Sequence, residues 1–166
     1  MMKNAKDLNS VNDCLLAHMD ELVPLIEERL SANGTVKLSP TGISMLPMLR
    51  QGIDCVVLSR PEKRLKKYDI PLYRRANGQY VLHRITSVSG DEYTCIGDNQ
   101  FNYEKGVAHK SVIAVVTAFT RGDKTYTVKY PPYRIYCVLW HYTRFFRRVF
   151  RALKRRAVRI LSKKHK

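Results

Sequence analysis

The chain of 166 residues is 45% hydrophobic and 10% aromatic, which suits a single domain with its own apolar core and excludes a disordered protein. No apolar run approaches the roughly 20 residues of a membrane-spanning helix, and no apolar stretch follows the first lysines as in a signal peptide, so we expect a cytoplasmic protein. The net charge of +16 is unevenly placed: residues 1–128 hold 17 basic and all 14 acidic side chains, whereas residues 129–166 hold 13 basic side chains and no acidic one. This asymmetry predicts an anionic partner for the C-terminal segment.

The first predicted element is an amphipathic helix over residues 10–32. Its apolar side chains recur at intervals of three and four, and Asn33-Gly34 is a stop signal directly behind it. Pro24 lies inside the run and should kink or divide the helix, because proline lacks the N–H that a helical hydrogen bond needs. The apolar stripe consists of Leu15, Met19, Leu22, Ile26 and Leu30.

From Thr35 onward the sequence changes to short runs rich in β-branched and aromatic residues, separated by turn signals such as Asn77-Gly78 and Gly90-Asp91. Many short strands at this spacing predict a mainly β fold, a compact coiled antiparallel sheet or barrel, with one helix before it and one after it. The predicted strands occupy residues 54–60, 69–75, 80–88, 92–98, 112–120 and 124–130.

The strand region ends at Pro131 and Pro132, because proline cannot continue a β ladder. Beyond them apolar side chains continue at helical spacing as far as Leu161, while arginines and lysines fill the other side, which predicts a basic amphipathic helix. The predicted domains are an N-terminal helical segment (1–34), a β domain (35–130) and the basic C-terminal helix (131–166).

An anionic membrane surface is the partner that we favour for residues 134–166. Each basic residue near such a surface contributes about 1 kcal/mol of binding free energy, and the aromatic side chains of Trp140, Phe145 and Phe146 can lie among the lipid headgroups. A purely structural role, with the stripe packed on the first helix, ranks second, and binding to RNA or DNA phosphates ranks third. We therefore expect peripheral association with a membrane.

Two residues in the β region could form a nucleophile and its base. Ser44 lies in a turn-prone stretch between Gly42 and Pro47, and His83 lies in the middle of an alternating strand-like run. A serine hydroxyl must have a base within hydrogen-bond reach before it can attack a carbonyl. The spacing alone leaves open the simpler interpretation of a turn serine and a core histidine.

Four segments, taken in order, resemble the signal peptidase I and LexA-like peptidase superfamily. They are "GISMLPMLRQGIDCVVL", "LKKYDIPLYRR", "YVLHRI" and "CIGDNQ", and they correspond to the family's G-x-S-M-x-P box, G-D-I-V strand, second box with the base, and G-D-N turn. The resemblance covers residues 35–120. It implies a serine endopeptidase with an all-β core in which Ser44 is the nucleophile.

The resemblance implies that His83 is the base, because histidine stands where bacterial signal peptidases and LexA have lysine. The chain is in this respect similar to the archaeal and endoplasmic-reticulum signal peptidases. An imidazole with a pKa near 6.5 could take the serine proton at neutral pH. The third member is open between Asp98 of the G-D-N turn and Glu104 six residues later, which we rank equally.

The sequence departs from the family pattern at four points. Gly42 stands where signal peptidases have a serine that helps to bind the oxyanion, so we expect backbone amides around Ser44 to do this. "RQGID" carries one extra residue, and "YD" replaces the G-D of the next box. The family's transmembrane anchor is missing, and residues 134–166 could replace it.

The resulting prediction is a serine endopeptidase acting on a peptide or precursor protein. A LexA-like regulatory or self-cleaving protease is the alternative, but no helix-turn-helix pattern precedes the β region and the lysine base is absent. A third possibility is a catalytically silent module that binds membranes or nucleic acids. We expect no cofactor and no metal, because the four cysteines lack metal-ligand spacing and should be reduced thiols; they are Cys14, Cys55, Cys95 and Cys137.

Overall fold

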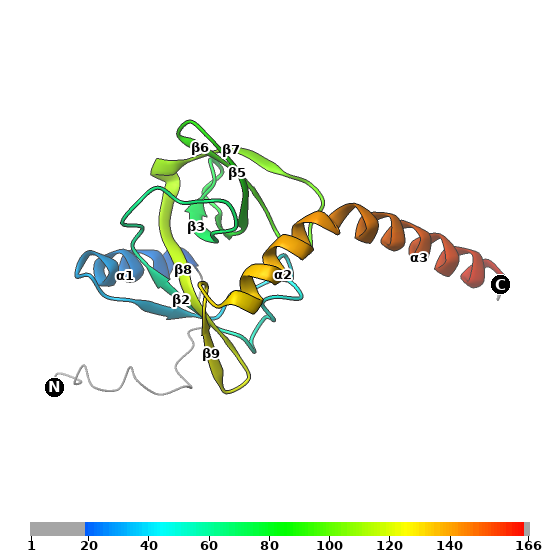
Figure 1. Ribbon diagram of the computed structural model, residues 1–166, viewed down its shortest axis with the longest axis horizontal. Coiled ribbons are helices and arrows are strands. Elements are labelled where there is room, and N and C mark those ends of the chain that lie inside the picture. The colour runs from blue at the N-terminus through cyan, green and yellow to red at the C-terminus, as the bar shows by residue number, and fades with distance from the viewer. Residues whose placement is uncertain (1–18, 165–166) are drawn as a thin grey trace. The chain divides into compact units, whose positions relative to one another are not determined.

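The computed structural model describes residues 19–164, which divide into two compact units, one ending at Tyr130 and the other beginning at Pro131 (Figure 1). The first unit is mainly β, as predicted, and its helix α1 (Met19–Ser31) precedes two antiparallel sheets. The elements that follow α1 in this unit are β1 (Val36–Leu38), β2 (Val56–Ser59), β3 (Pro71–Arg74), β4 (Tyr80–Leu82), β5 (Arg84–Ser89), β6 (Glu92–Ile96), β7 (Glu104–Ala108), the 3-10 turn η2 (His109–Ser111), β8 (Val112–Arg121) and β9 (Lys124–Thr127).

The larger sheet curls into a half-barrel around its longest strand, β8 (Figure 1). Its strands follow the order β1-β2-β8-β3-β4, and β9 also pairs with β8. Strand β4 therefore lies at an edge of this sheet. The smaller sheet has the order β5-β6-β7. Bulges in the β2–β8 and β3–β8 ladders increase the local twist and help the larger sheet to curl.

Both sheets contribute to one apolar cluster. Tyr73 of β3 packs there with Ile85 of β5, and both side chains are almost completely buried. Alternate residues of each strand point to the same side, so the alternating sequence pattern places these side chains inward. The remaining members are Leu65, Tyr93, Cys95 and Val107.

Helix α1 buries one stripe of its surface, formed by Leu22, Val23, Ile26 and Leu30. Pro24 lies inside the helix. Residues 10–18 of the predicted N-terminal helix lie outside the described residues. The helix ends where Asn33 adopts a positive φ of 55° and the N–H of Gly34 bonds to the carbonyl of Arg29, which is a common way to terminate a helix.

The strand predicted over residues 80–88 is wrong in one respect that matters for the site. The run divides at His83, since β4 belongs to the larger sheet and β5 to the smaller one. The histidine therefore lies where the chain passes between sheets and not in the middle of a strand. Strand β7, which begins at Glu104, is not among the predicted strands, because its sequence "EKGVA" does not alternate.

The predicted C-terminal helix forms two helices in the second unit, α2 (Pro131–Tyr142) and α3 (Arg144–Lys164). Prolines suit the first positions of α2, where a missing N–H breaks no helical hydrogen bond. The two helices meet through Arg147, whose guanidinium lies 3.5 Å from the centroid of the Trp140 ring and donates to the Trp140 carbonyl. Within residues 19–164, no helix combines the length and the apolar character needed to cross a bilayer.

A buried ion pair joins β5 to the G-D-N turn after β6, and its arginine also contacts the loop that carries Ser44. Arg84, the first residue of β5, donates from Nε and Nη2 to the two oxygens of Asp98 at 2.8 and 2.7 Å, and both side chains are at most 2% exposed. The same guanidinium contacts Met48 Sδ at 2.9 Å and the carbonyl of Tyr68 at 3.2 Å. Charged groups this deeply buried require such complete pairing, because leaving one unpaired is costly.

We expect Asp98→Asn to lower the free energy of unfolding by about 3–5 kcal/mol, because it leaves the buried Arg84 guanidinium without its counter-charge. Urea unfolding followed by circular dichroism measures this change. Asp91→Asn is the matched control, since it breaks an ion pair with Arg64 in which Asp91 is 93% exposed and which should contribute no more than about 1 kcal/mol. Equal stability of the two variants would contradict the importance of the Arg84–Asp98 pair.

Candidate active site

Ser44 lies in the loop of residues 39–55, which joins β1 to β2 and contains turns but no strand or helix. The G-D-N turn after β6 holds this loop from one side. The backbone N–H of Asn99 donates to the carbonyl of Ser44 at 2.8 Å, and its side-chain amide donates to the carbonyl of Ile43 at 3.0 Å. Two hydrogen bonds from one residue thus hold the peptide groups before and after Ser44.

Two glycines allow the loop to adopt this position. Gly42 has a positive φ of 82°, which residues with a side chain rarely adopt. Gly97 lies so close to the loop that a Cβ atom would stand 2.6 Å from the carbonyl oxygen of Ser44. The glycine of the G-D-N turn is therefore required here because of contact with the Ser44 backbone.

The far end of the loop is anchored by Asp54, which is completely buried. Its carboxylate accepts from the Arg50 backbone N–H and from the Arg50 guanidinium, and Arg121 of β8 adds a contact at 3.3 Å. Arg121 also donates to the carbonyls of Pro47 and Met48. Burial alone would raise the pKa of Asp54, but the hydrogen bonds from Arg50 and the charges of Arg121 and Arg50 hold it below its ordinary value.

His83 and Ser44 line the same pocket, which has a volume of about 450 Å³. His83 lies between β4 and β5 and is only 2% exposed, whereas Ser44 is partly exposed. No hydrogen bond joins the two side chains in the described part of the chain. The other lining residues include Pro40, Thr41, Gly42, Arg75, Tyr80 and Gln100.

Behind the imidazole lie Glu104 and Tyr73, two side chains of different sheets. The Nδ1 atom of His83 is 3.4 Å from the Tyr73 hydroxyl and 3.6 Å from Oε2 of Glu104. Arg75 donates to both oxygens of Glu104, at 2.7 and 2.8 Å. Glu104 is thus a candidate to orient His83, whereas the buried carboxylate of Asp98 is engaged by Arg84 through both of its oxygens.

Burial lowers the pKa of His83 to about 4; the charge of Arg75 acts in the same direction, and Glu104 counteracts only part of the shift. The value near 6.5 expected from the sequence is therefore wrong, because the ring is withdrawn from water. Burial would raise the pKa of Glu104, but hydrogen bonds from Arg75 and Tyr73 keep it below the ordinary value. At pH 7 the site holds a neutral imidazole beside an ionised carboxylate.

Sequence reasoning missed Tyr73 and Arg75, which surround Glu104. Both belong to the segment "LYRR", which the sequence pattern identifies only as a strand of the peptidase-like region. Neither could be found from spacing, because Glu104 lies 31 and 29 residues away along the chain. Ser44, His83 and Glu104 were all singled out from the sequence, and the fold brings them into one region.

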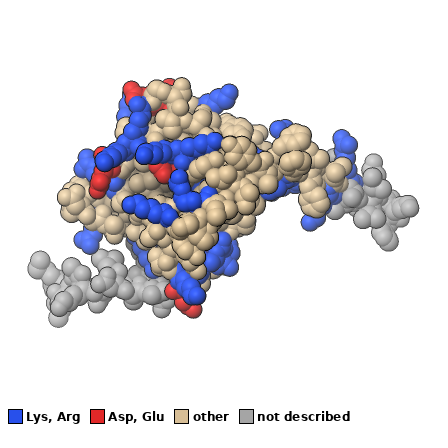
Figure 2. All heavy atoms as spheres, viewed as in Figure 1, with Lys and Arg blue, Asp and Glu red and all other residues tan. Residues whose placement is uncertain are grey.

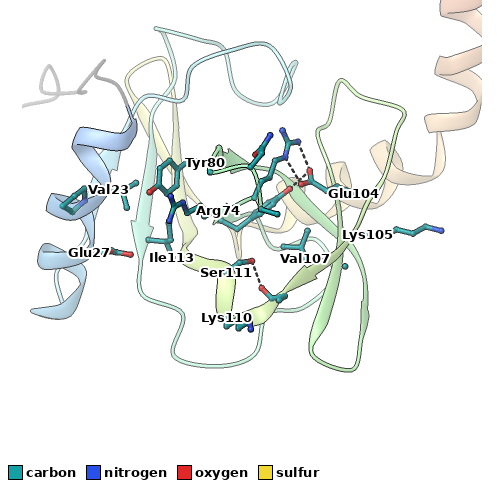
Figure 3. Close-up of a pocket in the computed structure, with 18 residues that line it drawn as sticks. Val23, Glu27, Arg74, Tyr80, Glu104, Lys105, Val107, Lys110, Ser111 and Ile113 are labelled. Carbon is teal, nitrogen blue, oxygen red and sulfur yellow. Dashed lines mark hydrogen bonds and ion pairs between the residues drawn. The ribbon is translucent and has the colours of Figure 1, made fainter.

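A second, larger pocket of about 1100 Å³ has Arg75 and Glu104 among its lining residues (Figure 3). Val23 and Glu27 of α1 line it from one side, and strands β3, β7 and β8 line it from the other. Tyr80 and Arg75 border both pockets. The larger pocket therefore adjoins the candidate site but contains neither Ser44 nor His83.

The described residues contain no group of three or more His, Cys, Asp or Glu side chains that could hold a metal ion. The prediction of four reduced thiols is wrong for Cys55, which is disulfide-bonded. Cys95 and Cys137 are buried and are not disulfide-bonded, and Cys14 lies outside the described residues. Burial raises the pKa of Cys95 to about 12, so it stays a thiol at neutral pH.

Comparisons of the chain with known protein families, curated proteins and solved structures gave no match.

The low pKa of His83 predicts a pH-dependent stability. The imidazole takes up a proton near pH 6.5 in the unfolded chain but only near pH 4 in the folded one. The unfolded state therefore binds more protons between these values, and the free energy of unfolding should fall as the pH drops from about 6.5 to about 4. Substituting His83→Gln should make this decline shallower.

Urea unfolding of the wild type and of His83→Gln at several pH values between 4 and 7 measures the difference. His109→Gln is the matched control. It removes a different tyrosine–histidine contact of the first unit, in which Nδ1 of His109 lies 2.7 Å from the Tyr93 hydroxyl. That variant should keep the contribution of His83. If the free energy of unfolding of His83→Gln falls with decreasing pH as steeply as that of the wild type, the lowered pKa of His83 is not its cause.

Proposed function

We propose that the protein is a serine endopeptidase of the signal-peptidase type that cleaves a peptide or precursor protein. The observation that carries this proposal is the shared pocket of Ser44 and His83, with Glu104 behind the imidazole. Ser44 and His83 come from two separate sequence boxes that resemble the Ser–His branch of the superfamily, and Glu104 stands six residues after Asp98 of a third box. The agreement between boxes and geometry supports a catalytic use more than a chance meeting of a turn serine and a core histidine does.

The chemistry proceeds in two halves. His83 takes the proton of the Ser44 hydroxyl as its oxygen forms a bond to the scissile carbonyl carbon, and then gives that proton to the leaving amine as the C–N bond breaks. In the second half, water gives a proton to the same imidazole as its oxygen bonds to the acyl carbon; the C–O bond to Ser44 then breaks, the imidazole returns the proton to the serine oxygen, and the second product leaves as the acid. A neutral imidazole is required at the start, and the low pKa of His83 supplies one at pH 7.

The oxyanion donors are the backbone amides beside Ser44. The N–H of Gly42 is engaged by the side chain of Gln51 at 3.0 Å, and glycine carries no hydroxyl to replace the family serine. The amides of Ser44 and Met45 remain on a loop whose carbonyls are held by Asn99. Fixed donors of this kind stabilise a developing oxyanion because they need not reorganise during the reaction.

An extended peptide is the substrate that best suits the surroundings of the pocket. Val81 and Leu82 of β4 line it, and β4 is an edge strand of the larger sheet. Edge strands offer main-chain donors and acceptors to another extended segment. A self-cleaving LexA-like protease is the second candidate, and a silent binding module the third; loss of cleavage in a serine variant separates both active candidates from the silent one.

We expect Ser44→Ala to abolish peptide cleavage with little change in stability, because Ser44 is partly exposed and fills little space. The measurement is mass spectrometry of a proteome-derived peptide mixture after incubation with the protein, in the presence of anionic vesicles. Ser89→Ala, an exposed serine at the end of β5, is the control and should cleave as the wild type does. If Ser44→Ala cleaved peptides as well as the wild type does, Ser44 could not be the nucleophile.

Peripheral binding to an anionic membrane through residues 134–166 belongs to the same proposal. Helix α3 carries apolar side chains on one side and basic ones on the other, and Phe145, Phe146 and Phe150 are each about 70% exposed. Figure 2 shows one face of the molecule, on which Lys and Arg far outnumber Asp and Glu. Such a helix can lie at the headgroup level, with its aromatic side toward the acyl chains.

Neutralising four basic residues of α3 should weaken binding to anionic vesicles by two to three orders of magnitude, given about 1 kcal/mol for each charge. The variant is Arg148→Gln, Arg151→Gln, Lys154→Gln, Arg155→Gln, and vesicle co-sedimentation with and without RNA as competitor measures the effect. The matched control neutralises four exposed lysines of the β unit, Lys63, Lys66, Lys105 and Lys110.

The control variant should lose far less binding than the α3 variant. Equal losses would mean that the overall charge, and not α3, attracts the membrane. If RNA releases the wild type from the vesicles at a phosphate concentration far below that of the lipid, the basic helix binds a nucleic acid instead.

A further inference from the structure

We infer that Tyr73 is the positioning residue of the site: its hydroxyl connects Glu104 to His83 and determines which ring nitrogen of His83 is left to receive the serine proton. This inference rests on the proposed function for its catalytic consequence. The hydrogen-bond chain itself does not, and it can be tested separately.

The count of protons around Glu104 fixes the direction of each hydrogen bond. Both carboxylate oxygens accept from Arg75, and Oε2 also accepts from the Tyr73 hydroxyl at 2.8 Å. A phenol has one proton to donate, so the Tyr73 oxygen can offer only a lone pair to its other neighbour. That neighbour is Nδ1 of His83, at 3.4 Å.

His83 must therefore carry its proton on Nδ1 when the ring is neutral. The opposite tautomer would place a nitrogen lone pair against an oxygen lone pair, with the Glu104 carboxylate 3.6 Å away. With Nδ1 protonated, Nε2 holds the lone pair that a base needs. The carboxylate acts on the imidazole through the phenol, since Tyr73 lies closer to both partners than they lie to each other.

Tyr73 is suited to this task because it can neither move nor ionise. It is 1% exposed, it belongs to β3, which pairs with β4 and β8, and it packs in the cluster shared by both sheets. Burial, together with the hydrogen bond to Glu104, raises the pKa of its phenol above the ordinary value. The charged or titratable groups that act on His83 are Glu104, Arg75 and Asp98, and none of them needs to change its state for the tautomer to hold.

The decisive measurement is the protonation of each His83 ring nitrogen at pH 7, read from long-range ¹H–¹⁵N correlation spectra and assigned with His83→Gln. In the wild type we expect the proton on Nδ1. Tyr73→Phe should move His83 toward the Nε2-protonated tautomer. For a peptide that the wild type cleaves, kcat should fall about tenfold to a hundredfold with little change in KM, less than the roughly 10²–10⁴ attributed to a general base as a whole.

Tyr93→Phe is the matched control, because Tyr93 is equally buried and its hydroxyl contacts a different histidine, at 2.7 Å from Nδ1 of His109. It should change neither the His83 tautomer nor kcat. Glu104→Gln provides a second variant that keeps the shape of the side chain; it should disturb the same tautomer.

A wild-type His83 protonated on Nε2 would overturn the inference, and so would an unchanged tautomer in Tyr73→Phe. An unchanged kcat despite a changed tautomer would overturn the positioning role. If the wild type cleaves no peptide, the proposed function fails, while the tautomer spectra still decide whether the hydrogen-bond chain exists.

Discussion

The buried ion pair of Arg84 and Asp98 is the interaction on which the candidate site depends most directly. Its two members are sequence neighbours of residues that form the candidate site. Arg84 follows His83, and Asp98 lies between Gly97 and Asn99, which contact the Ser44 backbone. One pair of charges therefore ties the imidazole and the serine loop to the same point in the core.

Two other carboxylates of the same unit, Asp54 and Glu104, are paired with arginines beside the serine loop and beside His83. At the far end of the loop, Asp54 accepts hydrogen bonds from Arg50 and Arg121. Behind the imidazole, Glu104 accepts hydrogen bonds from Arg75 and Tyr73. Each carboxylate is ionised because its donors outweigh the cost of its burial. For His83, the nearby carboxylates offset only part of the cost of burying a charged imidazole, so the ring stays neutral. A neutral ring is the form that a general base requires.

Much of the fold was predictable from the sequence, because alternation and turn residues report directly on strands such as β6 and β8. The division of the run 80–88 was not, since the alternating pattern continues through His83 although the chain changes sheets there. Residue spacing also could not show whether Glu104 or Asp98 orients His83, because that depends on which carboxylate is paired with Arg84 in the fold. The pKa of His83 was missed for a related reason: it is set by burial, which appears only when both sheets close over the ring.

The close approach of Gly97 to Ser44 has a consequence for how tolerant this protein can be of sequence change. A single methyl group at position 97 would need the space now filled by the Ser44 carbonyl oxygen, and that oxygen belongs to backbone that cannot rotate away. The substitution Gly97→Ala would therefore push the serine loop outward and crowd the side chain of Gln100, while replacing no side chain of the pocket. Inspection of the pocket lining alone would not reveal this change, so the backbone position of Ser44 depends on the smallest residue of the G-D-N turn.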